Sequence, residues 1–279
     1  INKISNASIE IVPRDTGSDP NITLRSAKEL SELGIKIIIG PVFNHDLEYL
    51  GELKEITFLS LTNRSGHKSK NIVNAGINAT SQITAIKKFI ELNRIQKTIF
   101  LIPDVDYKNE IKKAISSSKI KIFKNYTYNT DPTKLTNQIE KITNYKIRKQ
   151  NLKDEILRLE KSDENNKERL IEKLEKQDTL GSVEFDSLII ADFDESLKSV
   201  TTSLLYTDIS PKHKYFITLN QWFDKSLLNE TSSQPLYFPS INKKNYEEFS
   251  SEYFKKFNHY PNQLSFLSFD LVGLVYYLI

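Results

Sequence analysis

The sequence contains no cysteine and no methionine, and only four of its 279 residues are histidine. Without cysteine the chain has no disulfide, no thiol nucleophile and no thiolate ligand for a metal ion. The histidines lie far apart and do not show the spacing of a metal-binding motif: His45, His67, His213 and His259. None of them stands in a recognisable hydrolase motif with a serine or an aspartate. We therefore expect no metal site, no cofactor and no catalytic residues.

Long hydrophobic runs and an excess of one charge are also missing. The most apolar stretch, SFLSFDLVGLVYYLI at 265–279, is shorter than the roughly 20 residues of a membrane-spanning helix and contains Asp270. We expect it to be a core helix, and we expect no transmembrane segment in the chain. The formal net charge is only +3, with basic and acidic residues interspersed, so nothing indicates nucleic-acid binding. There is no GxGxxG motif and no phosphate-binding loop, which argues against nucleotide binding.

The sequence does contain a regular alternation of apolar strands and amphipathic helices. The segment IKIIIGPVF at 35–43 is a short isoleucine-rich run that Gly40-Pro41 ends, because proline has no N–H to donate to a sheet. Such a run is typical of a strand buried on both faces of a parallel sheet. Further strands are expected at 8–15, 56–62, 71–76, 97–104, 119–128, 185–192, 213–220 and 235–241. Helices are expected at 21–33, 44–55, 81–93, 107–117, 194–205, 245–258 and 263–278, and one that begins at Asp131 and Pro132.

This alternation predicts an α/β protein in which helices flank parallel sheets. The number of strands indicates two such sheets rather than one. Residues 146–178 interrupt the alternation, because more than half of them are charged while their charges nearly cancel. Their apolar residues recur at helical spacing in two groups, one before and one after KSDENN: Leu152, Ile156 and Leu159, then Leu170 and Leu174.

We interpret 146–178 as a helical hairpin inserted in the second lobe of the protein. Asp154 with Arg158, and Glu172 with Lys176, have the i,i+4 spacing that adds a few tenths of a kcal/mol to a helix. Two interpretations of the hairpin remain open. It is either a solvated appendage that packs on itself or an arm that binds a partner.

Polar residues follow several of the predicted strands. Because open parallel sheets bind ligands beyond the carboxyl ends of their strands, these residues are candidates for lining a ligand cleft. They are Asn44, His45, Thr62, Asn63, Arg64, Asp104, Tyr107, Asp192 and Trp222. Two D-x-D motifs, at 104–106 and 192–194, also suit a divalent metal in a nucleotide-sugar transferase. Helix capping by Asp106 and Asp194 is the simpler interpretation of these motifs, and a place in the core is the simpler one for Trp222.

Seven segments run in order through nearly the whole chain: PRDTG (13–17), GPVF (40–43), FLSLTN (58–63), IPDVDY (102–107), DTLGSVEFDSLIIAD (178–192), LNQWFD (219–224) and FKKFNHYPNQLSFLSFDLVGL (254–274). Together they resemble the leucine-binding-like branch of type I periplasmic binding proteins. More narrowly, they resemble the penicillin-binding protein activators, which are bacterial lipoproteins related to the solute-binding components of ABC transporters. The last segment is the most specific of the seven.

The resemblance implies two Rossmann-like lobes of parallel sheet with a cleft between them. The first lobe is expected at 1–95, completed by 245–279, and the second at 96–244, including the hairpin 146–178. The resemblance also implies a periplasmic location, with a lipid anchor in the outer membrane on a segment outside these residues. It implies no catalysis.

Within the activators, the chain is expected to bind and stimulate a peptidoglycan synthase, a penicillin-binding protein, through protein contacts. The alternative is a solute-binding receptor that delivers an amino acid or a similar small polar ligand to an ABC permease.

The chain departs from the family pattern in several places. The family opens with a strand of the type LLLPLSG before IEIVPRD (9–15) and ends with closing strands; because 1–279 contain neither, we expect a fragment of a longer chain. Amino-acid-binding relatives have serine or threonine soon after the GP dipeptide, where this chain has VFNH. LTNRS replaces a small-residue turn, and Tyr107-Lys108 replaces Tyr-Gly. These changes predict a polar cleft without a tight site for a free amino acid.

Overall fold

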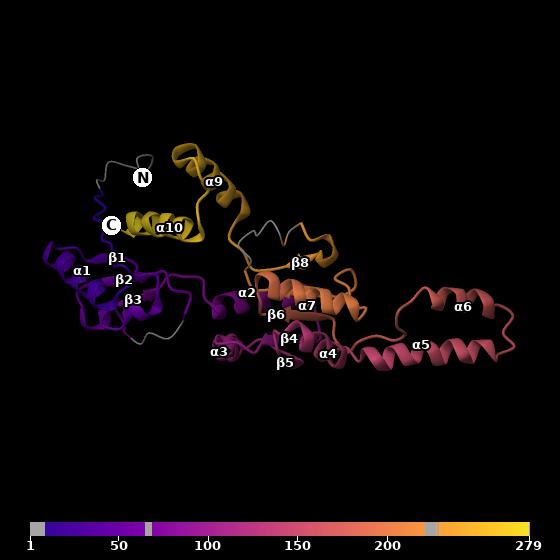
Figure 1. Cartoon of the computed structure of the whole chain (residues 1–279). Helices are drawn as coiled ribbons and strands as arrows, with labels where there is room; N and C mark the ends of the chain where they lie inside the picture. The colour runs from indigo at the N-terminus through magenta and orange to yellow at the C-terminus, as the bar shows by residue number, and fades with distance from the viewer. Residues whose placement is uncertain (1–8, 65–68, 221–226, 228, 279) are drawn as a thin grey trace. The chain divides into compact units, whose positions relative to one another are not determined.

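The computed structural model describes residues 9–64, 69–220, 227 and 229–278. The chain divides into two compact units (Figure 1). Unit 1 comprises Ile1–Ser81 and Ile241–Ile279, and unit 2 comprises Gln82–Ser240. Each unit contains its own parallel sheet. The alternation of strands and helices that the sequence predicts therefore produces the expected α/β fold. No helix within the described ranges has the length and apolar character needed to cross a membrane.

Unit 1 is built on a small sheet with the strand order β1-β2-β3. Its strands are β1 (Ile37–Ile39), β2 (Thr57–Ser60) and β3 (Ile72–Asn74). Its helices are α1 (Pro20–Glu32), α9 (Lys243–Phe257) and α10 (Gln263–Leu278), with the 3₁₀ turns η1 (Asn44–Leu47) and η2 (Leu50–Glu52). The core of this unit lies between α1, the two turns and β2, where Ala27, Leu47, Leu50, Ile56 and Phe58 are buried together.

Two elements expected in unit 1 differ from the structure. No strand forms within 9–15, because the backbone groups of Ile9–Val12 have no hydrogen-bond partner among the described residues. The helix expected at 44–55 is instead the pair of 3₁₀ turns η1 and η2. Leu47, Leu50 and Leu53 recur at intervals of three, which suits the three residues per turn of a 3₁₀ helix better than the 3.6 of an α-helix.

Unit 2 contains a sheet of five parallel strands in the order β5-β4-β6-β7-β8. Its strands are β4 (Thr98–Pro103), β5 (Lys124–Tyr128), β6 (Ser187–Ile190), β7 (Tyr215–Thr218) and β8 (Leu236–Tyr237). Its helices are α2 (Ala79–Leu92, from Gln82 on), α3 (Lys108–Ser118), α4 (Pro132–Ile142), α5 (Tyr145–Glu160), α6 (Lys167–Glu175) and α7 (Asp194–Tyr206), with the 3₁₀ turn η3 (Thr231–Ser233). Every residue of β4 and β6 is buried, as their continuous apolar sequences predict.

The start of α4 shows how local sequence fixes an element of unit 2. The carboxylate of Asp131 accepts a hydrogen bond from the backbone N–H of Thr133 at 3.0 Å, and Pro132 occupies the first helical position. This confirms the start that the sequence predicts, since an aspartate N-cap followed by proline satisfies one free N–H and removes another. Leu135 and Ile139 of the same helix are buried in the main core cluster of the unit.

Helix α2 belongs to unit 2 from Gln82 on, whereas the sequence analysis expected 81–93 in the first lobe. The backbone N–H of Asn220 donates to Oε1 of Gln82 at 2.8 Å. The ring of Phe89 lies 5.9 Å from that of Tyr215 and 5.1 Å from that of Tyr237, measured between centroids. The helical periodicity of α2 shows that one face is apolar, but it does not show which sheet that face covers.

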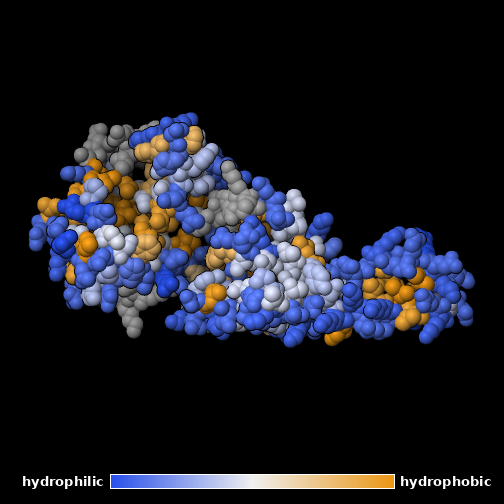
Figure 2. All heavy atoms as spheres, viewed as in Figure 1, coloured by the Kyte–Doolittle hydropathy of each residue, from blue (hydrophilic) through white to orange (hydrophobic). Residues whose placement is uncertain are grey.

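Helices α5 and α6 pack against each other and extend away from the sheet of unit 2 (Figure 1). Leu152 and Leu159 of α5 are buried, whereas no residue of α6 is. Apolar side chains gather on the surface of this hairpin (Figure 2), with Leu157 49% exposed. Of the two charge pairs that the spacing suggested, Glu172–Lys176 forms at 2.7 Å. Asp154 instead accepts from the side chain of Gln150 at 2.8 Å, and Arg158 pairs with Glu155 and Glu164.

The buried guanidinium of Arg148 anchors the base of α5 to the rest of unit 2. It donates to the carbonyl oxygen of Gly181 at 3.1 Å, to that of Thr207 at 3.0 Å and to Oγ1 of Thr179 at 2.6 Å. Its Nη2 also lies 3.4 Å from a carboxylate oxygen of Asp208. Since two separate segments, 179–181 and 207–208, hold one side chain, the hairpin leaves the body of the unit at a fixed point.

Candidate functional site

The strand order of unit 2 changes direction between β4 and β6. Strand β4 pairs with β5 on one side and with β6 on the other, so the connections that follow β4 and β6 lead to opposite halves of the sheet. In an open parallel sheet, ligands bind where the strand order reverses, beyond the carboxyl ends of the strands. Asp104 follows β4 directly, and Asp192 lies two residues beyond β6. The two D-x-D motifs therefore begin at this point of the fold.

Asp192 is the centre of a buried hydrogen-bonded cluster at this edge. Its side chain accepts from the hydroxyl of Tyr128 at 2.5 Å, from the backbone N–H of Phe193 at 2.9 Å and from the hydroxyl of Tyr107 at 3.4 Å. Asp192 is 4% exposed and Tyr128 1% exposed, whereas Tyr107 is half-buried. The last residue of β5, the loop after β6 and the loop before α3 each supply one side chain. Solvent reaches this cluster mainly at Tyr107.

Burial controls the electrostatics of the cluster. It raises the pKa of Asp192 above the ordinary aspartate value, and the hydrogen bonds from Tyr128, Phe193 and Tyr107 only partly oppose that shift. Burial and the nearby negative charge of Asp192 both raise the pKa of the Tyr107 and Tyr128 hydroxyls. The two hydroxyls therefore stay protonated at neutral pH and act as donors. This arrangement holds a carboxylate in one orientation but does not generate a nucleophilic oxygen.

Asp104 lies in a different environment from Asp192, although both follow strands. Its side chain is 53% exposed and forms an ion pair with Lys108, the first residue of α3. Its backbone N–H donates to the carbonyl oxygen of Tyr128 at 2.8 Å, which ties the end of β4 to the end of β5. Asp104 is thus positioned next to the cluster by its backbone, while its charge is neutralised locally.

The prediction that Asp106 and Asp194 cap helices is wrong. The N-cap positions of α3 and α7 are Tyr107 and Phe193, and neither helix has a side-chain capping bond. Each aspartate lies one residue away from the N-cap position, where its carboxylate does not reach the N–H groups that a cap satisfies. The D-x-D motifs also do not gather three metal-ligating side chains anywhere in the part of the chain that the structure describes.

The candidate residues of unit 1 fall into two local groups. Asn44 and His45 begin η1, where Nε2 of His45 lies 3.1 Å from the carbonyl oxygen of Ser18 and 3.2 Å from Oδ1 of Asp46. The imidazole ring also stacks on Phe43, with 5.7 Å between centroids. These contacts hold His45 against the residues that precede α1.

The second group is the turn after β2, which begins at Thr62. Thr62 is buried, and its hydroxyl accepts from the backbone N–H of Arg64 at 3.2 Å. The side-chain amide of Asn74 donates to the carbonyl oxygen of Arg64 at 2.6 Å, and Asn63 is exposed. The structure thus brings Thr62, Asn63 and Arg64 together as one turn beside β3. Trp222, the remaining candidate, lies outside the described residues.

Tyr128 is the functional candidate that the sequence analysis missed. It ends the segment KNYTY of β5 and so lies within a strand, whereas the predicted candidates follow strands or belong to loops. The alternation within β5 places Lys124, Tyr126 and Tyr128 on one face, but it does not reveal that β5 lies next to β4. Only the strand order brings Tyr128 to Asp192, 64 residues later in the chain.

Comparison with solved structures identifies the class of fold. No protein-family model matches the chain, and no curated protein matches it. A branched-chain amino acid ABC transporter protein from Rhodospirillum rubrum superposes with a TM-score of 0.63 at 12% identity, covering 95% of this chain and 70% of that one. An ABC transporter substrate-binding protein from Desulfitobacterium hafniense gives 0.56 at 13% identity, with the same coverage. A periplasmic ligand-binding protein of a branched-chain amino acid ABC transporter from Burkholderia xenovorans LB400 gives 0.54 at 10% identity, covering 89% and 61%.

These likenesses show that the chain has the α/β fold of the type I periplasmic binding proteins, with parallel sheets flanked by helices. The structural neighbours are substrate-binding proteins of ABC transporters, of the leucine and branched-chain amino acid class. This part of the family resemblance is confirmed, whereas the narrower resemblance to the activators has no support among these neighbours.

Proposed function

We propose that the chain is the solute-binding receptor of an ABC transporter, acting outside the cytoplasm and holding a small polar ligand that it does not transform. This was the alternative function in the sequence analysis, and the structural neighbours favour it over the activator function. The observation that carries the proposal is the buried carboxylate of Asp192 at the point where the strand order of unit 2 reverses. The partner implied is an ABC permease. A lipid anchor and contacts with a peptidoglycan synthase remain predictions.

The chemistry of the cluster favours a ligand that carries a donor group. A carboxylate accepts hydrogen bonds only, and two protonated tyrosine hydroxyls fix the orientation of this one. A ligand that approaches from solvent meets the half-buried Tyr107 first, since the other members of the cluster lie behind it. An ammonium or amide group near Tyr107 would be attracted by the charge of Asp192. The raised pKa values of both tyrosines also make them poor nucleophiles, which fits binding without catalysis.

Isothermal titration calorimetry with a panel of amino acids, short peptides and other small polar solutes tests this function. We expect at least one amine-bearing solute to bind, and we expect Asp192→Asn to weaken that binding at least tenfold, about 1.4 kcal/mol. Tyr107→Phe should weaken it less, because the hydroxyl contributes one neutral hydrogen bond. Asp104→Asn is the matched control: its charge is already paired with Lys108, so it should change the affinity less than about threefold.

Two results would contradict the receptor function. Equal losses of affinity in Asp192→Asn and Asp104→Asn would mean that the cluster does not face the ligand. Failure of every solute to bind, combined with saturable binding of a purified peptidoglycan synthase, would establish the activator function instead.

A further inference from the structure

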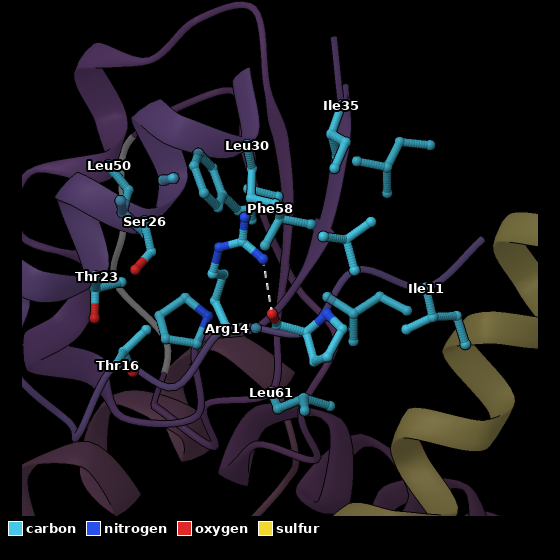
Figure 3. Close-up of a pocket in the computed structure, with 18 of the residues that line it drawn as sticks. Ile11, Arg14, Thr16, Thr23, Ser26, Leu30, Ile35, Leu50, Phe58 and Leu61 are labelled. Atoms are coloured by element: carbon cyan, nitrogen blue, oxygen red, sulfur yellow. Dashed lines mark hydrogen bonds between the residues drawn. The ribbon is translucent and has the colours of Figure 1, made fainter. Parts of the chain in front are cut away.

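Two apolar surfaces of the described chain differ in shape. In unit 1, Leu30, Ile35 and Leu61 line a hollow of about 830 Å³ (Figure 3). In unit 2, apolar side chains gather instead on the outer surface of the hairpin formed by α5 and α6 (Figure 2). Because this hairpin projects from the sheet, its surface is accessible to a large molecule. An apolar patch on such an element indicates an interface with another protein.

One broad side of the hairpin is apolar. Leu152 and Leu159 of α5 are buried and mark the line along which α5 faces α6. Since successive residues of a helix are about 100° apart, Ile156 and Leu157 turn away from that line toward one side. Helix α6 returns in the opposite direction, which brings Ile171 to the same side. Leu157 is 49% exposed, and Ile156 and Ile171 are partly exposed, because two helices that touch along one line leave such side chains uncovered.

The charged residues on the two sides of α5 differ in their pairing. On the side away from Ile156, Arg158 pairs with Glu155 at 2.8 Å and with Glu164 at 3.2 Å. On the apolar side, Lys153 and Glu160 are exposed and form no ion pair within the described part of the chain. They are about 10 Å apart along the helix axis, so they do not reach each other. The charges that can meet a partner therefore border the apolar side.

Charge also changes along the length of the hairpin. Its outer part, 154–171, contains six acidic and four basic residues. Its inner part, 146–153 with 172–178, contains six basic and three acidic residues. A second hairpin of the same sequence that lies in the opposite direction places its acidic end over the basic end of the first. Such complementary charges favour this antiparallel arrangement, whereas a parallel one brings like charges together.

We propose that a second copy of this chain packs its hairpin antiparallel against the apolar side of α5 and α6. Identical faces then meet about a two-fold axis, with Ile156 and Leu157 next to it. Lys153 and Glu160 lie at equal distances from the midpoint of Ile156 and Leu157, so Lys153 of each copy faces Glu160 of the other. The four helices enclose the apolar side chains that two helices leave open. This inference does not rest on the proposed function.

The size of the hairpin sets the strength of this contact. Helix α5 has 16 residues, which makes it about 24 Å long, and two packed helices are about 20 Å wide. Two such faces together bury roughly 1,000 Å², which is near the lower end of specific interfaces. We therefore expect a reversible dimer. Arg148 fixes the point at which α5 leaves the unit, so little ordering of the hairpin is needed on association.

Sedimentation velocity on the purified chain, from about 1 μM to about 500 μM, tests the self-association. We expect the average mass to rise from monomer toward dimer over this range. Leu157→Lys should raise the dimer Kd about tenfold or more, because it brings a charge to the centre of the contact. Ile147→Lys is the matched control: Ile147 is 62% exposed on the other side of the same helix, so its replacement should change the Kd less than about twofold. Monomer at every concentration, or equal effects of the two variants, would overturn the proposal.

Charge reversal tests the antiparallel arrangement. Glu160→Lys alone, or Lys153→Glu alone, should raise the dimer Kd at least about fivefold, because each brings like charges together in both symmetric contacts. The double variant Lys153→Glu/Glu160→Lys restores opposite charges and should bring the Kd to within about twofold of the wild type. Losses in both single variants without recovery in the double variant would overturn the antiparallel pairing. Self-association that none of these variants changes would lie elsewhere on the molecule and would overturn the proposal.

Discussion

Strands β1 and β6 have almost the same kind of sequence but very different surroundings. Ile37–Ile39 is half-buried along its whole length, whereas every residue of Ser187–Ile190 is buried. The difference lies in their neighbours, because β6 pairs with β4 and β7 while β1 pairs only with β2 among the described residues. An isoleucine-rich run therefore predicts a strand, but the burial of that strand depends on what occupies both of its edges.

The comparison extends from the strands to the two units. Among the described residues, unit 2 buries sixteen apolar residues in one cluster, which helices α4 and α7 cover. The corresponding cluster of unit 1 has five members in the described ranges. Helix α10 is strongly apolar in sequence, yet within Gln263–Leu278 it buries only Phe266 and Leu271. Within the described residues, unit 1 therefore has the smaller apolar core of the two units.

The largest effect is expected from matched truncations in these two strands. Ile190→Ala should destabilise unit 2 by about 4 kcal/mol, because Ile190 is fully buried in the main cluster. Ile38→Ala should destabilise unit 1 by about 1–2 kcal/mol, since Ile38 only packs against the edge of its cluster. Hydrogen exchange read separately in each unit measures both values. Equal losses would show that β1 is as well packed as β6.

The second effect concerns the base of the hairpin, where Arg148 ties α5 to the rest of unit 2. Arg148→Ala leaves the carbonyl oxygens of Gly181 and Thr207 without their donor, so we expect α5 to lose about 2–3 kcal/mol of protection against exchange. Lys149→Ala, the exposed neighbour, should change protection by less than about 0.5 kcal/mol. If both variants behave alike, the guanidinium does not anchor the hairpin, and α5 is held by apolar contacts at Leu152 and Leu159 instead.

Much of the fold could be predicted from the sequence, because apolar periodicity determines strands and helices locally. The starts of α1 and α4, each with aspartate followed by proline, are of this kind. Three features could not be predicted in this way. Residues 9–15 alternate like a strand but pair with no strand among the described residues. The periodicity of α2 does not show which sheet its apolar face covers, and a linear pattern does not contain the strand order.

In the candidate site, too, some features could be predicted from the local sequence and others depend on the strand order. Asp192 could be selected because it follows a buried strand, and the structure places it at the centre of a cluster. Asp104 fits the same rule, but its charge is paired with Lys108. What separates the two aspartates is burial by Tyr128, which depends on β5 lying beside β4.

The smallest effect expected is the pH dependence that Asp192 contributes to unit 2. Its pKa in the folded protein is raised by burial, whereas an unfolded aspartate titrates near 3.9. Between those two pKa values the folded state binds more protons than the unfolded state, so the free energy of unfolding falls as pH rises through this window. Lowering the pH from neutral should therefore stabilise the wild type relative to Asp192→Asn, which cannot titrate. Asp104→Asn, with Asp192 intact, should keep the wild-type dependence.

Tyr128→Phe sharpens this measurement, because it removes one of the hydrogen bonds that hold the pKa of Asp192 down. Without that donor the carboxylate is still buried, so the window should widen and the stabilisation on acidification should increase. If the wild type instead loses stability relative to Asp192→Asn as pH falls, the pKa of Asp192 must be depressed. The effect of the hydrogen bonds from Tyr107, Tyr128 and Phe193 on the pKa of Asp192 would then exceed the effect of burial. Asp192 would be an anion whose charge is already stabilised by these donors, and it would attract the donor group of a ligand only weakly.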